Sequence, residues 1–167
     1  IWVVGQIKQL DPDSSWNNTG TEKFNVAHWN GEKWEMRRLC PPSDHFFSAK
    51  DIKVYNNEDV WITSNGTLDH YDGDGVKELW TIGNWERGGI RHMWVSSPSD
   101  IYCAGRKGVI VHYDGSSCEM MDSGTDIRFR DISGKGDNVF VTGWDYDGGS
   151  IALGLKEGEW KKVFKSK

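Results

Sequence analysis

The chain has 167 residues, 37% of them hydrophobic, with 20 Lys and Arg against 25 Asp and Glu. Its net charge is −5 and no Lys/Arg run is longer than Arg37-Arg38 or Lys161-Lys162, which argues against nucleic acid as a partner, because phosphate binding needs a basic face. No apolar stretch approaches the roughly 20 residues of a membrane helix, so we expect one globular region, 1–167, without a membrane span.

A repeated pattern of short β-type segments runs through the whole chain. The 10 Trp and 20 Gly beside only 4 Pro favour short strands joined by tight turns. The repeat unit is roughly 41 residues long and carries up to four strands, named a, b, c and d in order. Its clearest marker is His, then an aromatic residue, then Asn-Gly or Asp-Gly, beginning at His28, His70 and His112 in steps of 42 residues. The Asn-Gly and Asp-Gly pairs predict hairpin turns between c and d in which both central residues have positive φ.

The units are expected at about 1–46, 47–87, 88–124 and 125–167. The first unit has strand b at 1–5, strand c ending in the His28 marker and strand d at 34–36. The second has a at 51–55, b at 60–64, c ending in the His70 marker and d at 76–78. The third has a at 90–95, b at 101–105, c ending in the His112 marker and d at 118–120, and the fourth has a at 127–132, b at 139–143 and d at 160–162.

Four antiparallel strands repeated at this period predict an all-β fold, a β-propeller of four-stranded blades. The b segments are apolar on both faces, as expected for a strand packed between two neighbouring blades, whereas a β-sandwich would require alternation there. The chain opens at strand b, so we expect fifteen strands and a first blade without its innermost strand. We therefore expect residues upstream of Ile1 to belong to the same domain, in a larger ring of roughly 6–8 blades. A four-bladed ring with a defective first blade is the alternative.

Several residues with chemical potential have structural explanations. His28, His70 and His112 occupy equivalent positions in different blades, more than ~10 Å apart, so we predict a structural role for them and no metal site. Cys103 and Cys118 align with hydrophobic positions of other units and are expected in the core, while the state of Cys40 stays open. Acidic doublets in the turns are explained by turn chemistry, and no motif indicates a cofactor.

Propeller topology places the b–c loops and the d–a crossings on one face of the molecule. That face carries the irregular segments, whereas the a–b and c–d turns of the other face are short and polar. Aromatic and Arg side chains on such loops are common anchors of binding interfaces, although they can also fold back to cap the blades. The candidate binding residues are Trp16, His45, Phe47, Trp85, Arg87, Trp144, Asp145 and Tyr146.

The succession of Asp100 to Gly115, with His112-Tyr113-Asp114-Gly115 at its end, followed by Ser123-Gly124-Thr125, resembles the repeats of exported bacterial β-propeller proteins of Bacteroidetes-like genomes. The resemblance covers all four units and implies a location outside the cytoplasm, secreted, at the cell surface or in the periplasm. This chain departs from the repeat at Val76 and Cys118, where Trp is usual, and at Gly154, where the fourth unit lacks its His.

Two functions compete on these grounds. The favoured prediction is a noncatalytic interaction module that binds a protein or a glycan through the face of the long b–c and d–a loops. The alternative is a polysaccharide-acting hydrolase or lyase with acidic residues near the propeller axis. Upstream blades or another chain are further expected partners, because the open edge of the first blade is otherwise an aggregation hazard.

Overall fold

The structure is a computed structural model that describes residues 1–9, 22–40, 48–64, 66–81 and 89–166. The described residues form fifteen strands in four antiparallel sheets and contain no helix, hence none that could cross a bilayer. The first sheet has three strands and each later sheet has four, and in every sheet the strands lie in chain order. This confirms the all-β propeller prediction, including the first blade without its innermost strand.

The strand bounds follow the predicted segments. The first sheet comprises β1 (Trp2–Gln9), β2 (Glu22–Trp29) and β3 (Trp34–Arg37), and the second comprises β4 (Asp51–Asn56), β5 (Asp59–Thr63), β6 (Thr67–Tyr71) and β7 (Val76–Thr81). The third comprises β8 (Ile90–Ser97), β9 (Asp100–Gly105), β10 (Ile110–Tyr113) and β11 (Cys118–Met121). The fourth comprises β12 (Phe129–Lys135), β13 (Asn138–Trp144), β14 (Ser150–Lys156) and β15 (Glu159–Lys165).

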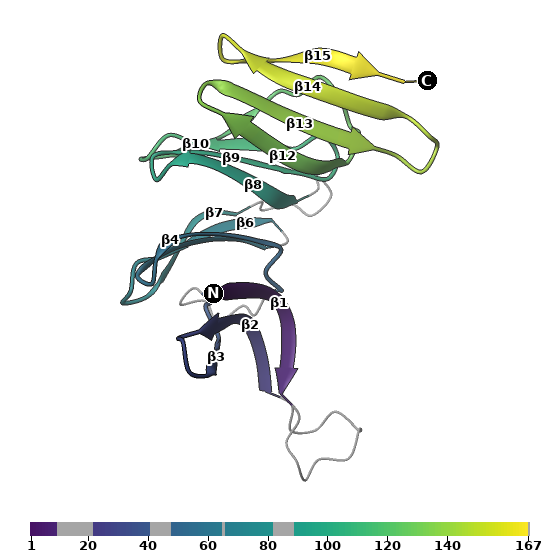
Figure 1. The fold of residues 1–167 in the computed structure, drawn as a ribbon. Coiled ribbons are helices and arrows are strands. Elements are labelled where there is room, and N and C mark those ends of the chain that lie inside the picture. Colours follow the sequence, from purple (N-terminus) through teal and green to yellow (C-terminus); the bar gives the residue numbers. More distant parts are fainter. Residues whose placement is uncertain (10–21, 41–47, 65, 82–88, 167) are drawn as a thin grey trace.

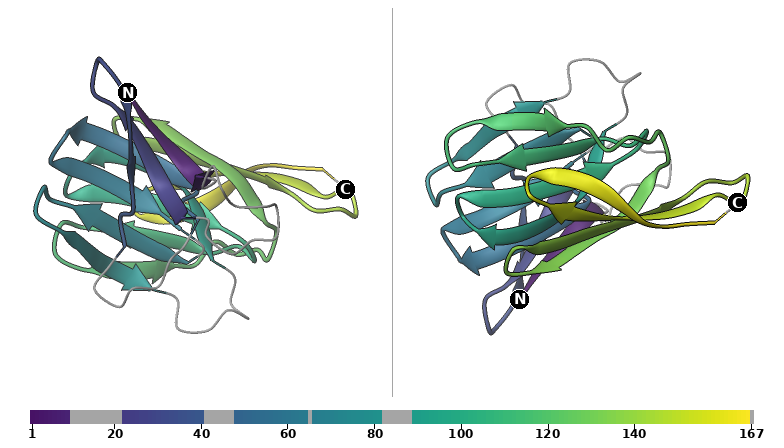
Figure 2. Two further views of the ribbon diagram at one scale, coloured as in Figure 1. Left: turned by 90° about the horizontal axis from the view of Figure 1, so that it is seen from below. Right: turned by 90° about the horizontal axis from the view of Figure 1, so that it is seen from above.

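The sheets follow one another in chain order, so that the first and the fourth lie at opposite ends of the molecule (Figure 1). Viewed along this succession, the first and last sheets are turned relative to the sheets between them (Figure 2). The innermost strands β4, β8 and β12 are neighbours in space. Two hydrogen bonds join the second and third sheets here. Met93 N–H donates to the Asp51 carboxylate at 2.9 Å, and the Thr63 hydroxyl donates to the Arg91 carbonyl at 3.1 Å.

The hydrophobic core consists of three layers, one in each interface between neighbouring sheets. The b strands of the two middle sheets, β5 and β9, contribute to two layers each, because alternate side chains point to opposite faces of a sheet. Val60 and Ile62 of β5 pack toward the first sheet, while Trp61 packs toward the third. Strand β5 is therefore buried on both faces, as predicted, and β9 shares this pattern. Strand β13, in the fourth sheet, instead alternates between buried and exposed residues.

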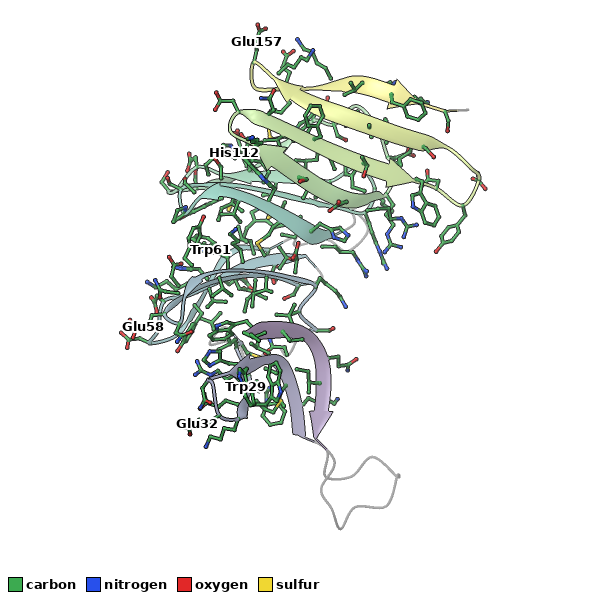
Figure 3. All side chains as sticks on the ribbon, in the orientation of Figure 1. Trp29, Glu32, Glu58, Trp61, His112 and Glu157 are labelled. Carbon is green, nitrogen blue, oxygen red and sulfur yellow. The ribbon has the colours of Figure 1, made fainter. Side chains whose placement is uncertain are left out.

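The hairpin turns and the irregular loops lie on opposite sides of the molecule. Glu32, Glu58 and Glu157 mark the tips of three hairpins and point to the same side in Figure 3. The β13–β14 loop lies on the other side (Figure 1). We name these sides the turn face and the loop face, and this division of the connections agrees with the one that propeller topology predicts.

The c–d turns differ in detail from the prediction. Gly31, Gly73 and Gly115 have positive φ, whereas Asn30, Asp72 and Asp114 do not. The Asn and Asp residues instead precede the two central positions, and their side chains accept backbone N–H groups from the far side of the turn. Gly at the first central position is the pattern of a type II′ turn, so the expectation of two positive φ values was wrong here. Both central residues do have positive φ in the β14–β15 turn, at Glu157 and Gly158.

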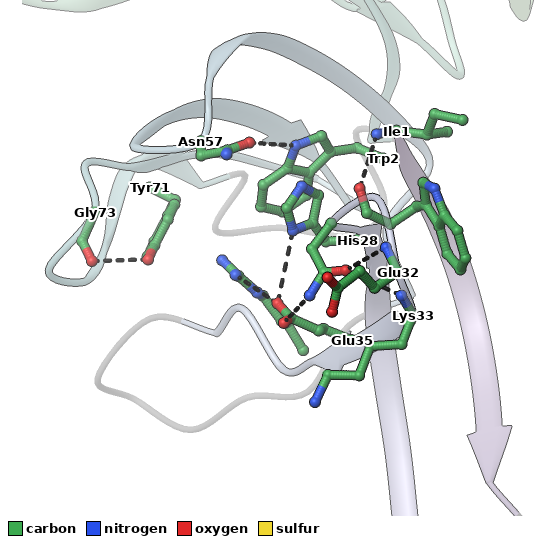
Figure 4. A network of polar contacts seen from close by, with 12 residues as sticks. Ile1, Trp2, His28, Glu32, Lys33, Glu35, Asn57, Tyr71 and Gly73 are labelled. Atoms are coloured by element: carbon green, nitrogen blue, oxygen red, sulfur yellow. Dashed lines mark hydrogen bonds and ion pairs between the residues drawn. The ribbon is translucent and has the colours of Figure 1, made fainter.

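The repeated histidines have the structural role that was predicted. The rings of His28, His70 and His112 stack on Trp2, Trp61 and Tyr102 respectively, with centroids 4.2–4.3 Å apart. His70 and His112 also place Nε2 at 2.9 and 2.8 Å from the carboxylates of Asp59 and Asp100, the first residues of β5 and β9. In the first sheet Glu35 lies beside His28, and Trp2 donates to Asn57 of the second sheet (Figure 4).

The cysteines are free thiols. Cys103 is fully buried in the layer between the second and third sheets, and Cys118 packs against the same layer. Burial raises the pKa of the Cys118 thiol to about 11 and that of Cys103 still further. Both therefore act as small core hydrophobes, as predicted.

Candidate functional site

Three of the eight candidate residues can be placed in the structure. Trp16, His45, Phe47, Trp85 and Arg87 lie outside the described residues. Trp144, Asp145 and Tyr146 stand together at the end of β13 and the start of the loop to β14, on the loop face. The structure thus brings these three together.

Trp144 and Tyr146 form an exposed aromatic pair. Their rings meet edge to face at 5.8 Å, and 45% of Trp144 and 86% of Tyr146 are exposed. The guanidinium of Arg130, from β12, stacks on the Trp144 ring with Cζ 3.8 Å from the ring centroid, and it lies 5.8 Å from that of Tyr146. A cation over an aromatic face is attracted by the ring quadrupole, so this contact holds Arg130 against the aromatic pair.

Backbone bonds hold the loop that carries the pair. Trp144 N–H donates to the Arg128 carbonyl at 3.2 Å, and Asp145 N–H donates to the Gly149 carbonyl at 2.9 Å. The Asp145 carboxylate in turn accepts the Arg128 N–H at 3.4 Å. Asp145 therefore ties the β13–β14 loop to the start of β12 and positions the aromatic pair. A hollow of about 490 Å³ lies beside this loop, lined by Ile127, Asp145, Asp147, Gly149, Lys165 and Ser166.

Cations recur at one position of the innermost strands. Asp51, His92 and Asp131 pair with Thr63, Ala104 and Thr142, which are equivalent residues of the b strands. The residues before them, Lys50, Arg91 and Arg130, are therefore also equivalent. Arg91 and Arg130 both sit at register shifts, where the extra residue of a β-bulge can be aimed away from the regular pleat.

Two further arginines join these three, and we name the set Lys50, Arg91, Arg106, Arg128 and Arg130 the cation cluster. Arg106 lies in the loop between β9 and β10. Its backbone N–H donates to the carbonyl of Gly89, which precedes β8. Arg128 lies directly before β12. Side-chain nitrogen atoms gather on the loop-face side of the third and fourth sheets in Figure 3.

The like charges of the cluster act on one another. Burial lowers the pKa of the Lys50 amine, and the charges of Arg91 and Arg106 lower it further. Burial also lowers the pKa of the Arg91 and Arg128 guanidiniums, and in both cases the charges of Arg106 and Arg130 add to the effect. Nε of Arg128 and both Nε and Nη2 of Arg130 are buried atoms without a hydrogen-bond partner in the described part of the chain. The cluster is thus a region of concentrated positive charge in a chain whose net charge is −5.

Acidic side chains near the cluster already have structural partners. Both oxygens of Asp51 accept backbone N–H groups, from Ile52 at 2.8 Å and from Met93 at 2.9 Å. Asp131 accepts the N–H of Ile132 at 2.9 Å. Burial lowers the pKa of His92, and the charges of Arg91 and Arg128 lower it further, whereas Asp51 and Asp131 oppose the shift.

Sequence reasoning missed the cation cluster because its members come from three different blades. No two of them are adjacent in the sequence, so a search for Lys/Arg runs does not detect them. A detectable signal exists in the alignment of the a strands through their b partners, which places Lys50, Arg91 and Arg130 in one column. The bulges hide that column, because they add a residue to β8 and to β12.

The outer face of the first sheet is apolar. It carries Ile1, Val3, Trp29, Trp34 and Met36, of which only Trp29 is not strongly exposed. Val3 is 46% exposed, whereas its equivalents Ile62 and Cys103 are buried against the preceding sheet.

The outer face of the fourth sheet is also apolar, and it corresponds to the face that other sheets turn toward the following sheet. Phe140 is 47% exposed, whereas the equivalent Trp61 and Tyr102 are 3% and 9% exposed because the next sheet covers them. Val163 and Phe164 of β15 are exposed on this sheet as well. The first sheet thus exposes the face that normally packs on a preceding blade, and the fourth exposes the face that normally packs on a following one.

Comparison with known proteins gives likeness in structure only. No family model and no curated protein matches the chain. Among solved structures, the N-terminal domain of Nup159 matches with a TM-score of 0.47 and 8% identity over 81% of this chain and 33% of that one. A complex of Dbp5 from S. cerevisiae bound to Nup159 matches with the same TM-score and identity over 80% and 32%. The chain spans about a third of the length of these structures. Its class, a β-propeller built of repeated blades, follows from its own sheets.

Proposed function

We propose that this chain is a noncatalytic interaction module that binds a protein or a glycan through its loop face. The observation that supports this most is the exposed aromatic pair, Trp144 and Tyr146, stacked beside Arg130. Trp, Tyr and Arg are the residues enriched at binding hot spots, and loops on a rigid β scaffold are frequent carriers of function.

The pair is also positioned in advance of binding. The loop is fixed to β12 and closed on itself by backbone hydrogen bonds, and the Arg130 guanidinium covers one face of the Trp144 ring. A fixed anchor loses less conformational entropy on binding than a mobile one.

A glycosidase function has less support from the inner strands. Such enzymes need two carboxyl groups flanking the bond that is cleaved. Near the cation cluster, Asp51 accepts two backbone N–H groups and joins two blades, and Asp131 accepts the N–H of Ile132. These contacts suit carboxylates that shape the inner strands. A location outside the cytoplasm remains part of the proposal, on the strength of the resemblance to exported repeat proteins alone.

We also propose that blades of the same kind cover the outer faces of the first and fourth sheets. Within the chain, a face like that of Phe140 packs on a face like that of Val3 at every blade interface. In a solution of this chain alone, only a second copy offers the complementary face. A head-to-tail contact between copies is therefore the expected occupant.

The binding function is tested with peptide and glycan arrays probed by the labelled chain. We expect ligands that the wild type binds and that the double variant Trp144→Ala, Tyr146→Ala loses by about tenfold or more, since hot-spot truncations cost about 2 kcal/mol or more. Tyr55→Ala is a matched control, because Tyr55 is an exposed aromatic residue of β4 at its turn-face end. Absence of any bound ligand, or equal binding by the double variant, would contradict the proposal.

A further inference from the structure

Gathering five cations in one place costs the folded chain free energy. Like charges at short range repel, and burial makes each charge harder to hold. Burial lowers the pKa values of Lys50, Arg91 and Arg128, and the charges of neighbouring arginines lower them further. Buried guanidinium nitrogens without partners add to the cost, because an unsatisfied buried donor loses its hydration.

An anion placed among these side chains would relieve the cost. Guanidinium groups present fixed forks of N–H donors that match carboxylate and phosphate oxygens, and the Lys50 amine adds a point charge. Arg91 and Arg130 occupy equivalent bulges of successive blades, so this part of the cluster recurs with the repeat.

The distribution of charge over the molecule favours an acidic ligand on the loop face. The turn face carries acidic hairpin tips, among them Glu32, Glu58 and Glu157 (Figure 3). On the loop face Asp145 and Asp147 stand beside the fourth sheet, so its charge is not purely positive. Charge separated in this way steers an anionic segment toward the cluster and away from the turn face.

Polypeptide fits the surroundings better than glycan or nucleic acid. Arg130 covers one face of the Trp144 ring at 3.8 Å, so that face is not available for stacking a sugar ring. Recognition of acidic motifs by arginine clusters beside aromatic anchors is instead a recurrent mode of peptide binding.

We propose that the cation cluster binds the carboxylates of an acidic polypeptide segment, while Trp144 and Tyr146 pack against the same segment. This inference rests on the proposed function, since it assigns a ligand class to the loop face. Arg130 joins the aromatic pair to the cluster through its contacts with both rings, and the charges of Arg106 and Arg130 act on Arg91 and Arg128.

The test measures binding of a fluorescent hexaglutamate peptide by anisotropy, with hexaglutamine as the neutral probe. We expect saturable binding of hexaglutamate that weakens with added salt, and none of hexaglutamine. Arg106→Glu, an exposed loop position, should weaken binding by about tenfold or more, since it removes one charge-assisted contact and adds repulsion. Lys135→Glu makes the same change of charge at an exposed position on the turn-face end of β12 and should leave binding within about twofold.

Each outcome decides between the possibilities. Equal binding by Arg106→Glu and wild type, or no binding of hexaglutamate, would overturn the acidic-ligand inference. Tighter binding of oligogalacturonate or of a single-stranded oligonucleotide than of hexaglutamate would overturn the choice of polypeptide. If the arrays find neutral ligands that depend on Trp144 and Tyr146 while hexaglutamate fails, the interaction module stands and only the acidic ligand falls.

Discussion

At the scale of single residues, Asp69 is a buried carboxyl group at a position that is apolar in the other sheets. It faces Ile62 across β5 and β6, and the equivalent residues of the other sheets are Ala27, Val111 and Leu153. Burial, and to a smaller extent the charge of Glu78, raise the pKa of Asp69 to about 6 against the opposing hydrogen bonds from Thr67 and Ser64. Its Oδ1 atom has no partner in the described chain.

This environment predicts a fall in stability as the pH rises. The pKa of about 6 in the folded chain lies above the value of 3.8 for the free side chain, so the folded state holds the proton more tightly. The stabilisation is complete below pH 4 and is lost as the pH rises through 6, by an amount on the order of 2–3 kcal/mol. Asp69→Asn should match the wild type near pH 4 and exceed its free energy of unfolding at pH 7.5, as measured by urea denaturation.

A control keeps this prediction specific. Asp74→Asn removes a carboxylate of the same sheet from the exposed β6–β7 turn and should not reproduce the gain at pH 7.5. Parallel pH profiles for Asp69→Asn and the wild type would show that Asp69 is not the group responsible.

At the scale of the element, the c–d hairpins depend on one glycine each for their φ, but differ in what surrounds that glycine. Gly31 and Gly115 have φ values of 108° and 93°. A Cβ at Gly31 would meet nothing within 4 Å, whereas a Cβ at Gly115 would lie 2.6 Å from the Cβ of Ser99. The third hairpin, that of Gly115, therefore packs against the neighbouring a–b turn, and the first hairpin, that of Gly31, does not.

Alanine at the two glycines should separate backbone strain from crowding. Gly31→Ala is expected to lower the free energy of unfolding by about 1 kcal/mol, because positive φ disfavours a residue with a Cβ. Gly115→Ala should cost roughly 1–3 kcal/mol more, because the turn and Ser99 must move apart. Urea midpoints of the two variants test this, and Ser99→Gly combined with Gly115→Ala should recover part of the loss. Equal losses at both sites would contradict the packing of the third hairpin on the a–b turn.

At the scale of the whole molecule, the two exposed apolar faces are complementary and lie at opposite ends of the stack (Figure 1). A contact between unlike faces of two copies is heterologous and can extend or close, depending on the rotation it produces. We expect the mass measured by light scattering to rise above 19.0 kDa with concentration.

Charged substitutions at either end sharpen this prediction. Val3→Asp and Phe140→Asp should each be monomeric alone, because burying an unpaired carboxylate at the contact is costly. A mixture of the two should form a two-chain species, because each variant still offers the intact face that the other needs. A wild type that keeps the monomer mass at all concentrations, or a mixture of the two variants that stays monomeric, would contradict the predicted head-to-tail contact.

Much of the fold could be predicted from the sequence because it is local and repeated. Each strand is a run of a few residues, and the period places equivalent runs at a constant spacing. The sheets, their order and the three strands of the first sheet therefore follow without coordinates. The prediction of the c–d turns failed in detail because turn type depends on which two residues close the turn. In the first sheet these are Asn30 and Lys33, so Asn30 precedes the central positions and its side chain accepts the Glu32 N–H.

Only part of the candidate site could be predicted from the sequence. Trp144, Asp145 and Tyr146 could be named because they share one loop, while five of the candidates lie outside the described residues. Arg130 could not be paired with Trp144 in advance, because a bulge in β12 sets the direction of its side chain. The sequence alone therefore determined the repeat, the sheets and the loops that a site would use. Only the tertiary structure decided that cations from three blades converge, because charges far apart along a chain interact only once the inner strands are packed side by side.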